Sequence, residues 1–387
     1  MYLVRTARYE IRDIRIMLRY RLLFGTLMTL VFTAVVIFDG WLDGSLTSTA
    51  TDDKLIQGTI LCLLVILLII PAQFELSKLA AAKNLKIFLP VSVTASILFA
   101  ISCYMQQLVE FQQETYLSLL SAFVLLALLL YQYKFHGTSG VLANCGASYF
   151  SILYLGLLSS FFIAIRIEFG LWSLLMFVFV VKSADIGAYS IGSLFGKHKF
   201  SPKISPGKTW EGMGGAIGAA IIVAIGFSLI CDIMLWWPAI IFGLVFAFVG
   251  QLGDLAESMI KRDAEQKDSA DKVPGFGGVL DIVDSPLVAA PLAYLFFMYN
   301  RVIIIPNNVP VYISAKTIMA NISTMGTPKK FHQIIFHHIK HQFVALTMYL
   351  NVVHFIPSLI YLYGFRCAYM LYKFLPAIRA YNFFIIF

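Results

Sequence analysis

The sequence predicts an all-α, polytopic membrane protein with about nine transmembrane helices and two functional cytoplasmic loops. Of its 387 residues, 59% are hydrophobic and only 13% are charged, and the mean hydropathy is +0.82. Several apolar runs approach the ~20 residues that a helix needs to cross a bilayer. These runs lack the alternation of period two that a barrel strand requires. A spanning backbone must also satisfy its own hydrogen bonds, so helices are favoured.

Nine apolar runs are predicted to span the membrane. The first follows an Arg-rich start but is not followed by a small-residue cleavage site, so we expect it to be retained as a span. The predicted spans are 22–38, 55–71, 87–103, 117–133, 147–165, 169–182, 213–231, 236–252 and 285–305.

The charges of the connecting segments orient these spans. Residues 1–21 carry six arginines against two acids, and short basic segments stay in the cytoplasm. The segment after the first span carries four aspartates and one lysine, which suits the outside, and the alternation continues for eight crossings. Segments 183–212 and 254–284 are therefore both predicted on the cytoplasmic face. The inner (cytoplasmic) cell membrane is the expected location.

The remaining composition excludes other classes. Residues 285–387 contain eight Lys or Arg and no Asp or Glu, so the net charge of +8 comes from the tail. The bases are not interleaved with a soluble aromatic platform, so no nucleic-acid partner is expected. The five cysteines stand singly with no C-x-x-C spacing, so neither disulfides nor a thiolate metal site are expected.

The first unusual segment, Lys182 to Gly215, reads KSADIGAYSIGSLFGKHKFSPKISPGKTWEGMGG. Lys182, Asp185 and Tyr189 are spaced i, i+3 and i+7, so a helix would place them on one face. A charge at the end of a spanning helix is costly unless it is paired or hydrated. These charges therefore either snorkel to the interface or belong to a binding site.

The second half of this segment is rich in groups that bind phosphate. Two Ser-Pro pairs, at 201–202 and 205–206, are rigid and non-helical, and they present Lys208 on a stiff connector. Thr209 is predicted to cap the next helix, with Glu211 in its first turn. Converging hydroxyls, ammonium groups and backbone N–H groups are what a phosphate requires.

The second unusual segment reads ESMIKRDAEQKDSADKVPGFGGVLDIVDS, from Glu257 to Ser285. Between residues 254 and 284 the chain carries eight acids and four bases, a concentration that contrasts with the apolar runs around it. On a helix, one polar stripe would contain Gly250, Asp254, Glu257, Ser258 and Lys261.

A glycine-rich turn at 274–278 then returns the chain to Asp281 and Asp284. A hairpin that brings these residues back toward Asp254 would build an all-oxygen site. Hard oxygen ligands favour Mg²⁺, which usually binds together with substrate phosphate. The alternative is a solvated charge run in which Glu257 and Lys261 form an ordinary i,i+4 pair.

These two segments resemble the signature of the phosphatidate cytidylyltransferase (CDP-diglyceride synthase) family. The second carries S-x-x-K-R-x4-K-D at 258–268, and then a turn similar to the family's P-G-H-G-G-x-x-D-R-x-D. The first carries Asp185 with G-A-Y at 187–189, G-K at 196–197 and S-P-G-K-T-W-E-G at 205–212. The resemblance covers roughly 140–305 by motif and 15–140 by topology only.

Two positions depart from the family pattern. Phe276 stands where the family has His, and Ile282 stands where it has Arg. The loss of an imidazole and a guanidinium would alter an enzyme that depends on them. We expect both changes to be tolerated, because the aspartates and the Lys-Arg and Lys-Asp pairs are intact.

The resemblance implies transfer of a cytidylyl group from CTP to phosphatidate, with Mg²⁺, at the bilayer surface, and a possible homodimer. The implied catalytic residues are Lys208, Lys261, Arg262, Lys267 and Asp268. The implied substrate-binding residues are Asp185, Tyr189, Lys197, Ser205, Thr209, Glu211, Ser258, Gly277 and Gly278. The predicted metal ligands are Asp254, Asp281 and Asp284.

Two alternative functions stay open at this point. One is cytidylyl transfer to another lipid phosphate, such as an isoprenoid one, because acyl selectivity lies in generic span surfaces. The other is a transporter, which would place charges near span centres. Asp185 and Asp254 lie at predicted span ends, which disfavours it.

The chain accordingly divides into four parts. These are a basic cytoplasmic N-terminus (1–21), N-terminal transmembrane helices (22–140), a catalytic transmembrane region (141–305) and an atypical basic tail (306–387). The tail holds His337 and His341 at i, i+4, but no carboxylate or cysteine joins them, so a metal site there is not expected. Either an extra span near 343–363 changes the topology, or the tail is not a selected part of the fold. We expect the tail to pack poorly against the bundle and to have no catalytic role.

Overall fold

The computed structural model describes residues 27–46, 56–109, 111–266, 269 and 277–308, with side chains described as far as Arg301. The predictions for residues 1–21, for the tail beyond residue 308, and for Lys267, Asp268 and Phe276 lie outside the described residues.

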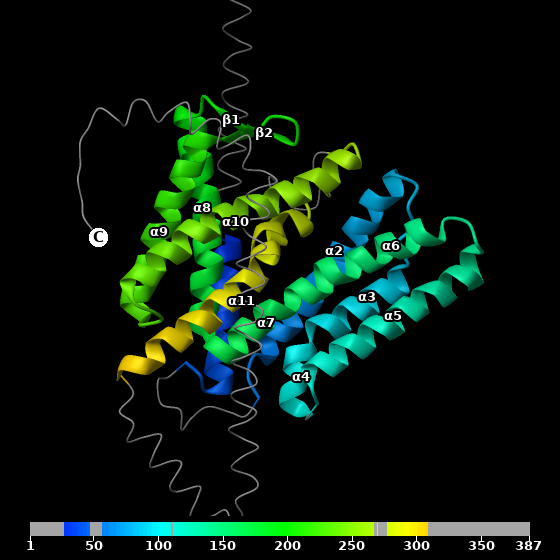
Figure 1. Cartoon of the computed structure of the whole chain (residues 1–387), viewed down its shortest axis with the longest axis horizontal. Coiled ribbons are helices and arrows are strands. Elements are labelled where there is room, and N and C mark those ends of the chain that lie inside the picture. Colours follow the sequence, from blue (N-terminus) through cyan, green and yellow to red (C-terminus); the bar gives the residue numbers. More distant parts are fainter. Residues whose placement is uncertain (1–26, 47–55, 110, 267–268, 270–276, 309–387) are drawn as a thin grey trace, which may run out of the picture. The chain divides into compact units, whose positions relative to one another are not determined.

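The described chain is predominantly helical, which confirms the predicted fold class (Figure 1). A first helix covers residues 27–43. It is followed by α2 (Thr59–Ala82), α3 (Leu89–Ala100), α4 (Ser102–Leu108), α5 (Gln113–His136) and α6 (Val141–Ile152). A π-helical turn, η1 (Leu153–Leu157), leads into α7 (Leu158–Phe169). The remaining elements are α8 (Leu171–Phe195), β1 (Lys199–Ser201), β2 (Ser205–Thr209), α9 (Trp210–Cys231), α10 (Trp236–Asp263) and α11 (Leu280–Asn308).

Among the described residues, seven helices are long and apolar enough to cross a membrane. They are α2, α5, the continuous α6–η1–α7 segment, α8, α9, α10 and the first 22 residues of α11. The other two predicted spans correspond to the helix at 27–43 and to α3 with α4, which a bend at Ile101 separates. The chain is a multi-pass membrane protein, but the count of nine spans is not confirmed.

Three helices continue well beyond the apolar runs that were predicted as spans, because polar residues extend each of them. The predicted span 55–71 continues as α2 to Ala82. The predicted span 169–182 continues as α8 to Phe195, so Lys182, Asp185 and Tyr189 lie on one helix, as their spacing indicated. The predicted span 236–252 similarly continues as α10 to Asp263. Hydropathy marks where a helix leaves the apolar region, not where its backbone hydrogen bonds end.

A small β-hairpin departs from the all-α prediction. β1 and β2 pair antiparallel, with Lys199 opposite Thr209 and Ser201 opposite Ser205. The Trp210 backbone N–H donates to the His198 carbonyl at 2.9 Å, which closes the open end of the hairpin. The Ser-Pro pairs were correctly predicted as non-helical, but their strand pairing was not.

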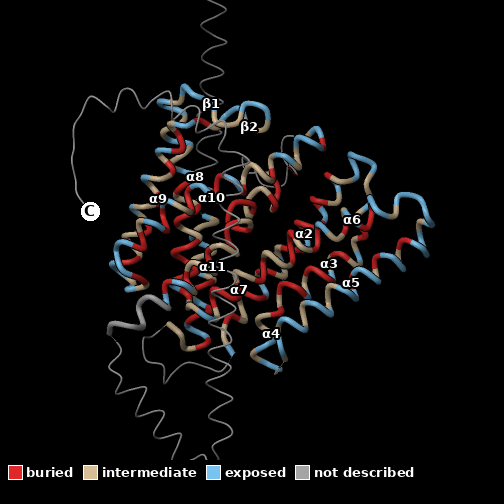
Figure 2. Tube along the Cα trace, viewed as in Figure 1, coloured by how far each residue is buried: buried red, intermediate tan, exposed pale blue. Residues whose placement is uncertain are grey.

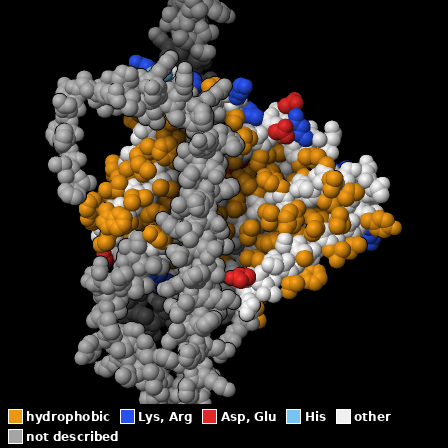
Figure 3. Space-filling view, in the orientation of Figure 1, with side chains coloured by type: hydrophobic (Ala, Val, Ile, Leu, Met, Phe, Trp, Pro, Cys, Tyr) orange, Lys and Arg blue, Asp and Glu red, His pale blue; other side chains and the backbone are white. Residues whose placement is uncertain are grey.

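The core lies between helices, and the outer helix faces are apolar. Figure 2 shows buried residues concentrated where the helices face one another. Large hydrophobic side chains also remain exposed, including Leu142 at 90% and Ile230 at 84%. Hydrophobic side chains cover most of the visible described face (Figure 3). This apolar outer surface is suited to contact with lipid acyl chains. Helices that keep apolar side chains on their outer faces are typical of membrane spans.

A fully buried charge cluster joins the first helix to α2 and α7. The Arg166 side chain is 0% exposed. Its Nε donates to Asp39 Oδ2 at 2.9 Å, and its NH2 donates to Asp43 Oδ2 at 2.7 Å. Asp39 also accepts the Ile60 backbone N–H at 2.8 Å. One guanidinium thus holds two carboxylates, and these in turn bind the N-terminus of α2, where helix N–H groups lack internal partners.

Replacing Arg166 by Ala is expected to lower the free energy of unfolding by about 3–5 kcal/mol, because two buried carboxylates would lose their counter-charge. The measurement is an unfolding titration of the purified protein in detergent micelles. Arg301→Ala is the control, because Arg301 is exposed and donates to the Glu168 carbonyl at the surface. It should change stability by about 0.5 kcal/mol or less. Equal losses in the two variants would contradict a special role for the buried cluster.

Candidate active site

The two unusual segments meet where the polar ends of α8, α10 and α11 come together. Lys208, on β2, donates from Nζ to Asp254 Oδ2 and to the Gln251 carbonyl, both at 3.0 Å. The Ser285 hydroxyl, on α11, contacts Asp254 and Asp185. Asp185 and Lys208 of the first segment therefore lie in one cluster with Asp254 and Ser285, which is consistent with the predicted placement of both segments on one face.

Glycines set the spacing of α8 and α9, which lie side by side (Figure 1). A Cβ atom on Gly187 would overlap the Gly215 carbonyl, and a Cβ atom on Gly215 would overlap the Gly187 carbonyl. A Cβ on Gly212 would lie 2.8 Å from the Ala188 carbonyl oxygen. The two backbones are thus in contact along a face that no larger residue would permit.

This contact carries the hairpin to the cluster. Thr209 is buried and caps α9, accepting the Gly212 backbone N–H on its Oγ1 at 3.1 Å. The predicted N-cap is confirmed. Because Thr209 is fixed against Gly192 and Gly196 of α8, its neighbour Lys208 is held on the side that faces α10.

Three carboxylates surround a single hydroxyl at the centre of the cluster. Ser285 Oγ lies 3.4 Å from Asp185 Oδ2 and 3.2 Å from Asp284 Oδ1, and it also contacts Asp254 Oδ1. Gly253 allows this approach, because a Cβ there would lie 2.9 Å from the Ser285 Cα. One hydroxyl has one proton to donate, so it satisfies at most one of these three oxygens at a time.

Two lysines offset this negative charge. Lys208 bonds Asp254, and Lys182 Nζ lies 3.6 Å from Asp185 Oδ2. The Asp185 and Asp254 side chains remain about one-quarter exposed, at 25% and 24%. Three carboxylates against two ammonium groups leave a negative excess that is open to a ligand from solution.

A second cluster, built around Asp281, lies at the start of α11. Its Oδ1 accepts from Lys261 Nζ at 2.5 Å. Its Oδ2 accepts from the Gly278 N–H at 2.7 Å, the Ser269 N–H at 3.1 Å and the Ser269 hydroxyl at 2.8 Å. Asp281 thus organises the chain on both sides of the glycine-rich turn.

The alternative interpretation, in which Glu257 and Lys261 form a solvated pair, is wrong. The pair exists, at 2.6 Å, but Glu257 is 1% exposed. Lys261 lies between Glu257 and Asp281, so the polar stripe on α10 faces α11 and not water.

The other predicted site residues lie near the surface of the same region. Lys197 donates its backbone N–H to Glu211 Oε2 at 3.1 Å, and Glu211 also contacts the His198 ring at 2.6 Å. Arg262 donates from Nε to the Ile204 carbonyl at 3.3 Å, which links α10 to the hairpin loop. The exposed Tyr189 lies on α8, Ser205 on β2, Ser258 on α10 and Gly277 shortly before α11.

The predicted metal ligands are not assembled as one group. Among the described residues, no group of three or more His, Cys, Asp or Glu side chains is arranged to hold a metal ion. Asp254 and Asp284 share Ser285, whereas Asp281 is occupied by Lys261 and three other donors. The prediction of Asp254, Asp281 and Asp284 as a metal triad stays a prediction.

Sequence reasoning missed several residues that connect the site. Ser285, Ser269 and Gln251 are small or neutral and carry no signal of charge. Gln251 Nε2 donates to Asp185 Oδ1 at 3.3 Å, and its carbonyl accepts from Lys208. Gln251 stands one helical turn from Asp254, and this polar neighbour inside an apolar run was the available signal.

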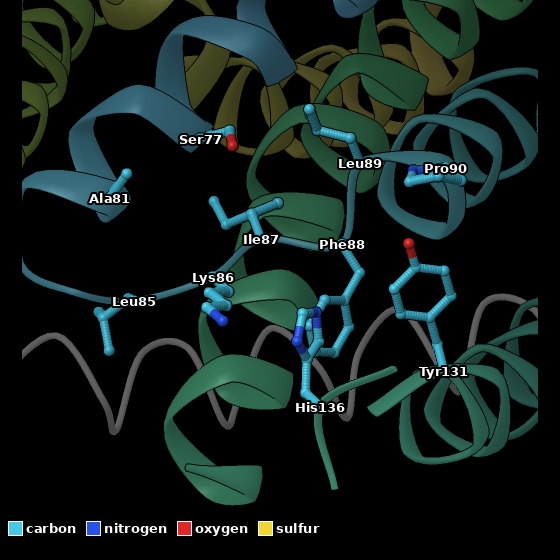
Figure 4. A pocket seen from close by; sticks show the side chains of 10 residues that line it. All are labelled: Ser77, Ala81, Leu85, Lys86, Ile87, Phe88, Leu89, Pro90, Tyr131 and His136. Carbon is cyan, nitrogen blue, oxygen red and sulfur yellow. The ribbon is translucent and has the colours of Figure 1, made fainter. Parts of the chain in front are cut away.

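A separate pocket of about 340 Å³ opens between the α2–α3 connection and the end of α5 (Figure 4). Lys86, Phe88, Tyr131 and His136 line it with six other residues. None of the predicted site residues is among them, so this pocket is not the candidate active site.

The fold and the charged clusters together define a class: a helical membrane protein in which charged side chains of separate segments are gathered outside the apolar runs. A model of the cytidylyltransferase family matches residues 54–300, which is more than half of the chain. The chain belongs to the cytidylyltransferase family. The match begins in the N-terminal helices, where the motifs alone had given only a resemblance in topology.

Named relatives match over a shorter region. The chain is 42% identical over 132 residues to the phosphatidate cytidylyltransferase of Haemophilus influenzae, covering 33% of this chain and 46% of that protein. It is 40% identical over 145 residues to that of Bacillus subtilis, covering 37% and 54%. It is 37% identical over 178 residues to that of Chlamydia pneumoniae, covering 42% and 58%. The chain thus spans about half the length of the curated relatives it matches.

Substituting Gly215 by Ala is expected to separate α8 from α9 and withdraw Lys208 from Asp254, because the new Cβ has no room. We expect a loss of about 1–3 kcal/mol in stability. The adjacent Gly214 is the matched control, since a Cβ there meets nothing within 4 Å. Gly214→Ala should be neutral or stabilising by up to about 1 kcal/mol. The measurement is the free energy of unfolding of both variants by denaturant titration. An unchanged free energy of unfolding in Gly215→Ala would contradict the close backbone contact between α8 and α9.

Proposed function

We propose that this protein transfers a cytidylyl group from CTP to phosphatidate, giving CDP-diacylglycerol and pyrophosphate for phospholipid biosynthesis. The observation that carries the proposal is the convergence of Lys208, Asp254, Asp284 and Ser285 from the two family motifs, in a chain of the cytidylyltransferase family. We take phosphatidate as the proposed lipid substrate because the relatives are named phosphatidate cytidylyltransferases. The inner membrane is the proposed location.

The main requirement of the reaction is to bring two anions, the phosphatidate phosphate and CTP, close together. A strong base is less important. The phosphatidate phosphate is a monoester, already largely dianionic near neutral pH. One of its oxygens forms a bond to the α-phosphorus of CTP, while the bond from that phosphorus to the bridging oxygen breaks and pyrophosphate leaves. Positioning and charge neutralisation supply most of the rate in such transfers. The loss of the family His at position 276 is compatible with this chemistry.

The lysines are placed to receive the phosphates. Lys208 and Lys261 bond Asp254 and Asp281, so a carboxylate holds each of them near the site. A phosphate oxygen offers these ammonium groups a second anionic acceptor. Lys182 adds a third positive charge beside Asp185. In the proposed function these three lysines bind and orient the nucleotide and the lipid phosphate.

The donor set fits Mg²⁺ in its chemistry. Asp254 and Asp284 offer hard oxygens around one shared hydroxyl, with more carboxylates than that hydroxyl can satisfy. Mg²⁺ is usually held by one or two carboxylates plus substrate phosphates, so a preassembled triad is not required. We propose Asp254 and Asp284 as its protein ligands, with Asp281 organising the turn. When bound, the ion would neutralise charge on the triphosphate and on the departing pyrophosphate.

The membrane supplies one substrate and water supplies the other. The charged clusters lie outside the apolar runs of α8, α10 and α11, and the outer helix faces are apolar (Figure 3). In the proposed function, CTP reaches these clusters from water, whereas the acyl chains of phosphatidate stay among the spans.

The direct test is CTP labelled at the α-phosphorus, incubated with the full chain in lipid vesicles, Mg²⁺ and a panel of lipid phosphates. We expect label in the lipid phase and stoichiometric pyrophosphate only when phosphatidate is present. Preferential labelling of an isoprenoid phosphate would replace phosphatidate with that substrate. No labelled lipid with any acceptor would overturn the proposed activity.

Asp254→Asn is expected to lower the rate at least about 100-fold, equivalent to about 2.7 kcal/mol of transition-state stabilisation. The change removes the charge partner of Lys208 and one proposed oxygen ligand. Asp232→Asn is the control, because Asp232 is an exposed cap at the other end of α9 with a φ of 53° that Asn also adopts. Full activity of Asp254→Asn at limiting Mg²⁺ would remove this residue from the site.

A further inference from the structure

A carboxylate far from both motifs reaches the second of them. Glu75 lies in the middle of α2 and is 0% exposed. Its Oε2 accepts the Leu280 backbone N–H at 2.9 Å and the Ser269 hydroxyl at 3.3 Å. These two partners flank the glycine-rich turn, about 200 residues away in sequence. No charge pattern in the sequence connects Glu75 to this turn.

The geometry points to Glu75 as a positioning residue for the second motif. We propose that its carboxylate fixes the start of α11, and through Ser269 the orientation of Asp281. Ser269 Oγ also contacts Asp281 Oδ2 at 2.8 Å, and Asp281 holds Lys261. A chain of contacts thus leads from α2 to a lysine proposed to bind phosphate. The kinetic part of this inference rests on the proposed function, whereas the structural part does not.

The glycine at position 278 supports this role. A Cβ on Gly278 would overlap both Glu75 Oε2 and Ser269 Oγ. The Gly278 backbone therefore approaches the Glu75 carboxylate as closely as a backbone without a side chain can. The missing side chain makes room for the carboxylate, and the Gly278 N–H is free to bond Asp281 instead.

A helix N-terminus is a suitable place for this carboxylate. The first N–H groups of a helix have no internal partners, and a negative group near them is favoured by the helix dipole. Glu75 supplies such a group from a different helix, which ties α11 to α2. The ion pairs from Lys83, which follows α2, to Glu265 at 3.4 Å and to Asp263 at 4.0 Å are exposed and so contribute little.

The test compares three variants of the full chain in lipid nanodiscs. Glu75→Ala removes both acceptor contacts, while Glu75→Gln keeps a carbonyl oxygen that can accept from Leu280. Gln73→Ala is the matched control, because Gln73 is also 0% exposed on α2 but bonds Ser96 Oγ and the Ser151 carbonyl. The control reports the general cost of losing a buried polar contact from the same helix.

The first readout is amide hydrogen exchange in peptides that cover residues 277–284. We expect exchange at least about tenfold faster in Glu75→Ala, because the Leu280 N–H loses its partner. Gln73→Ala should leave these peptides unchanged. Unchanged exchange in Glu75→Ala would overturn the positioning role, whatever the protein's activity.

The second readout is cytidylyl transfer per folded protein. We expect kcat/KM to fall at least about tenfold in Glu75→Ala and to stay within about threefold of wild type in Glu75→Gln, since misplacement of a reacting group costs rate. A merely structural role would instead lower the folded fraction of Glu75→Ala and Gln73→Ala alike, with equal activity per folded molecule. An inactive wild type would refute the proposed function and leave the exchange result standing.

Discussion

Carboxylates buried in an apolar helix bundle must find a counter-charge, and this constraint organises the molecule. Asp39 and Asp43 are held by Arg166, Asp254 by Lys208, and Asp281 by Lys261. An unpaired charge in such surroundings is very costly. All but the Lys261 pair join segments more than 40 residues apart, and that one spans 20. The contacts that neutralise charge therefore also fix which helices are neighbours.

The charge clusters differ in how completely they are satisfied. Around Arg166, two carboxylates receive a guanidinium and the backbone N–H groups that begin α2, and all three charged side chains are nearly inaccessible. Around Ser285, three carboxylates share one hydroxyl and two lysines, and about one-quarter of the Asp185 and Asp254 side chains is exposed. The first arrangement is closed to solvent and pairs its charges internally, so we regard it as structural. The second retains unused acceptors beside partly exposed side chains, as a binding site for a cation does.

Hydropathy and motif spacing predicted the helical class, a common face for the two segments and the Thr209 cap, because each depends on local residue type. They failed where tertiary packing decides. The α8 helix continues past its apolar run because Gly187 and Gly192 let α9 cover it. The burial of Glu257 comes from α11, which returns to α10 only after the turn. Glu75 lies outside both motifs, and nothing in its neighbours distinguishes it from an acid at the end of a span.

Because Lys208 bonds Asp254, binding of the proposed substrates would change the charge balance of this site. A triphosphate that draws Lys208 away from Asp254 leaves that carboxylate without its counter-charge, beside Asp185 and Asp284 at the same hydroxyl. A divalent cation at those oxygens restores the balance, and the nucleotide supplies the remaining ligands that the ion needs. Each partner thus relieves the electrostatic cost that the other creates. Under the proposed function, cation and nucleotide should bind with mutual cooperativity, because neither alone satisfies the charges of this site.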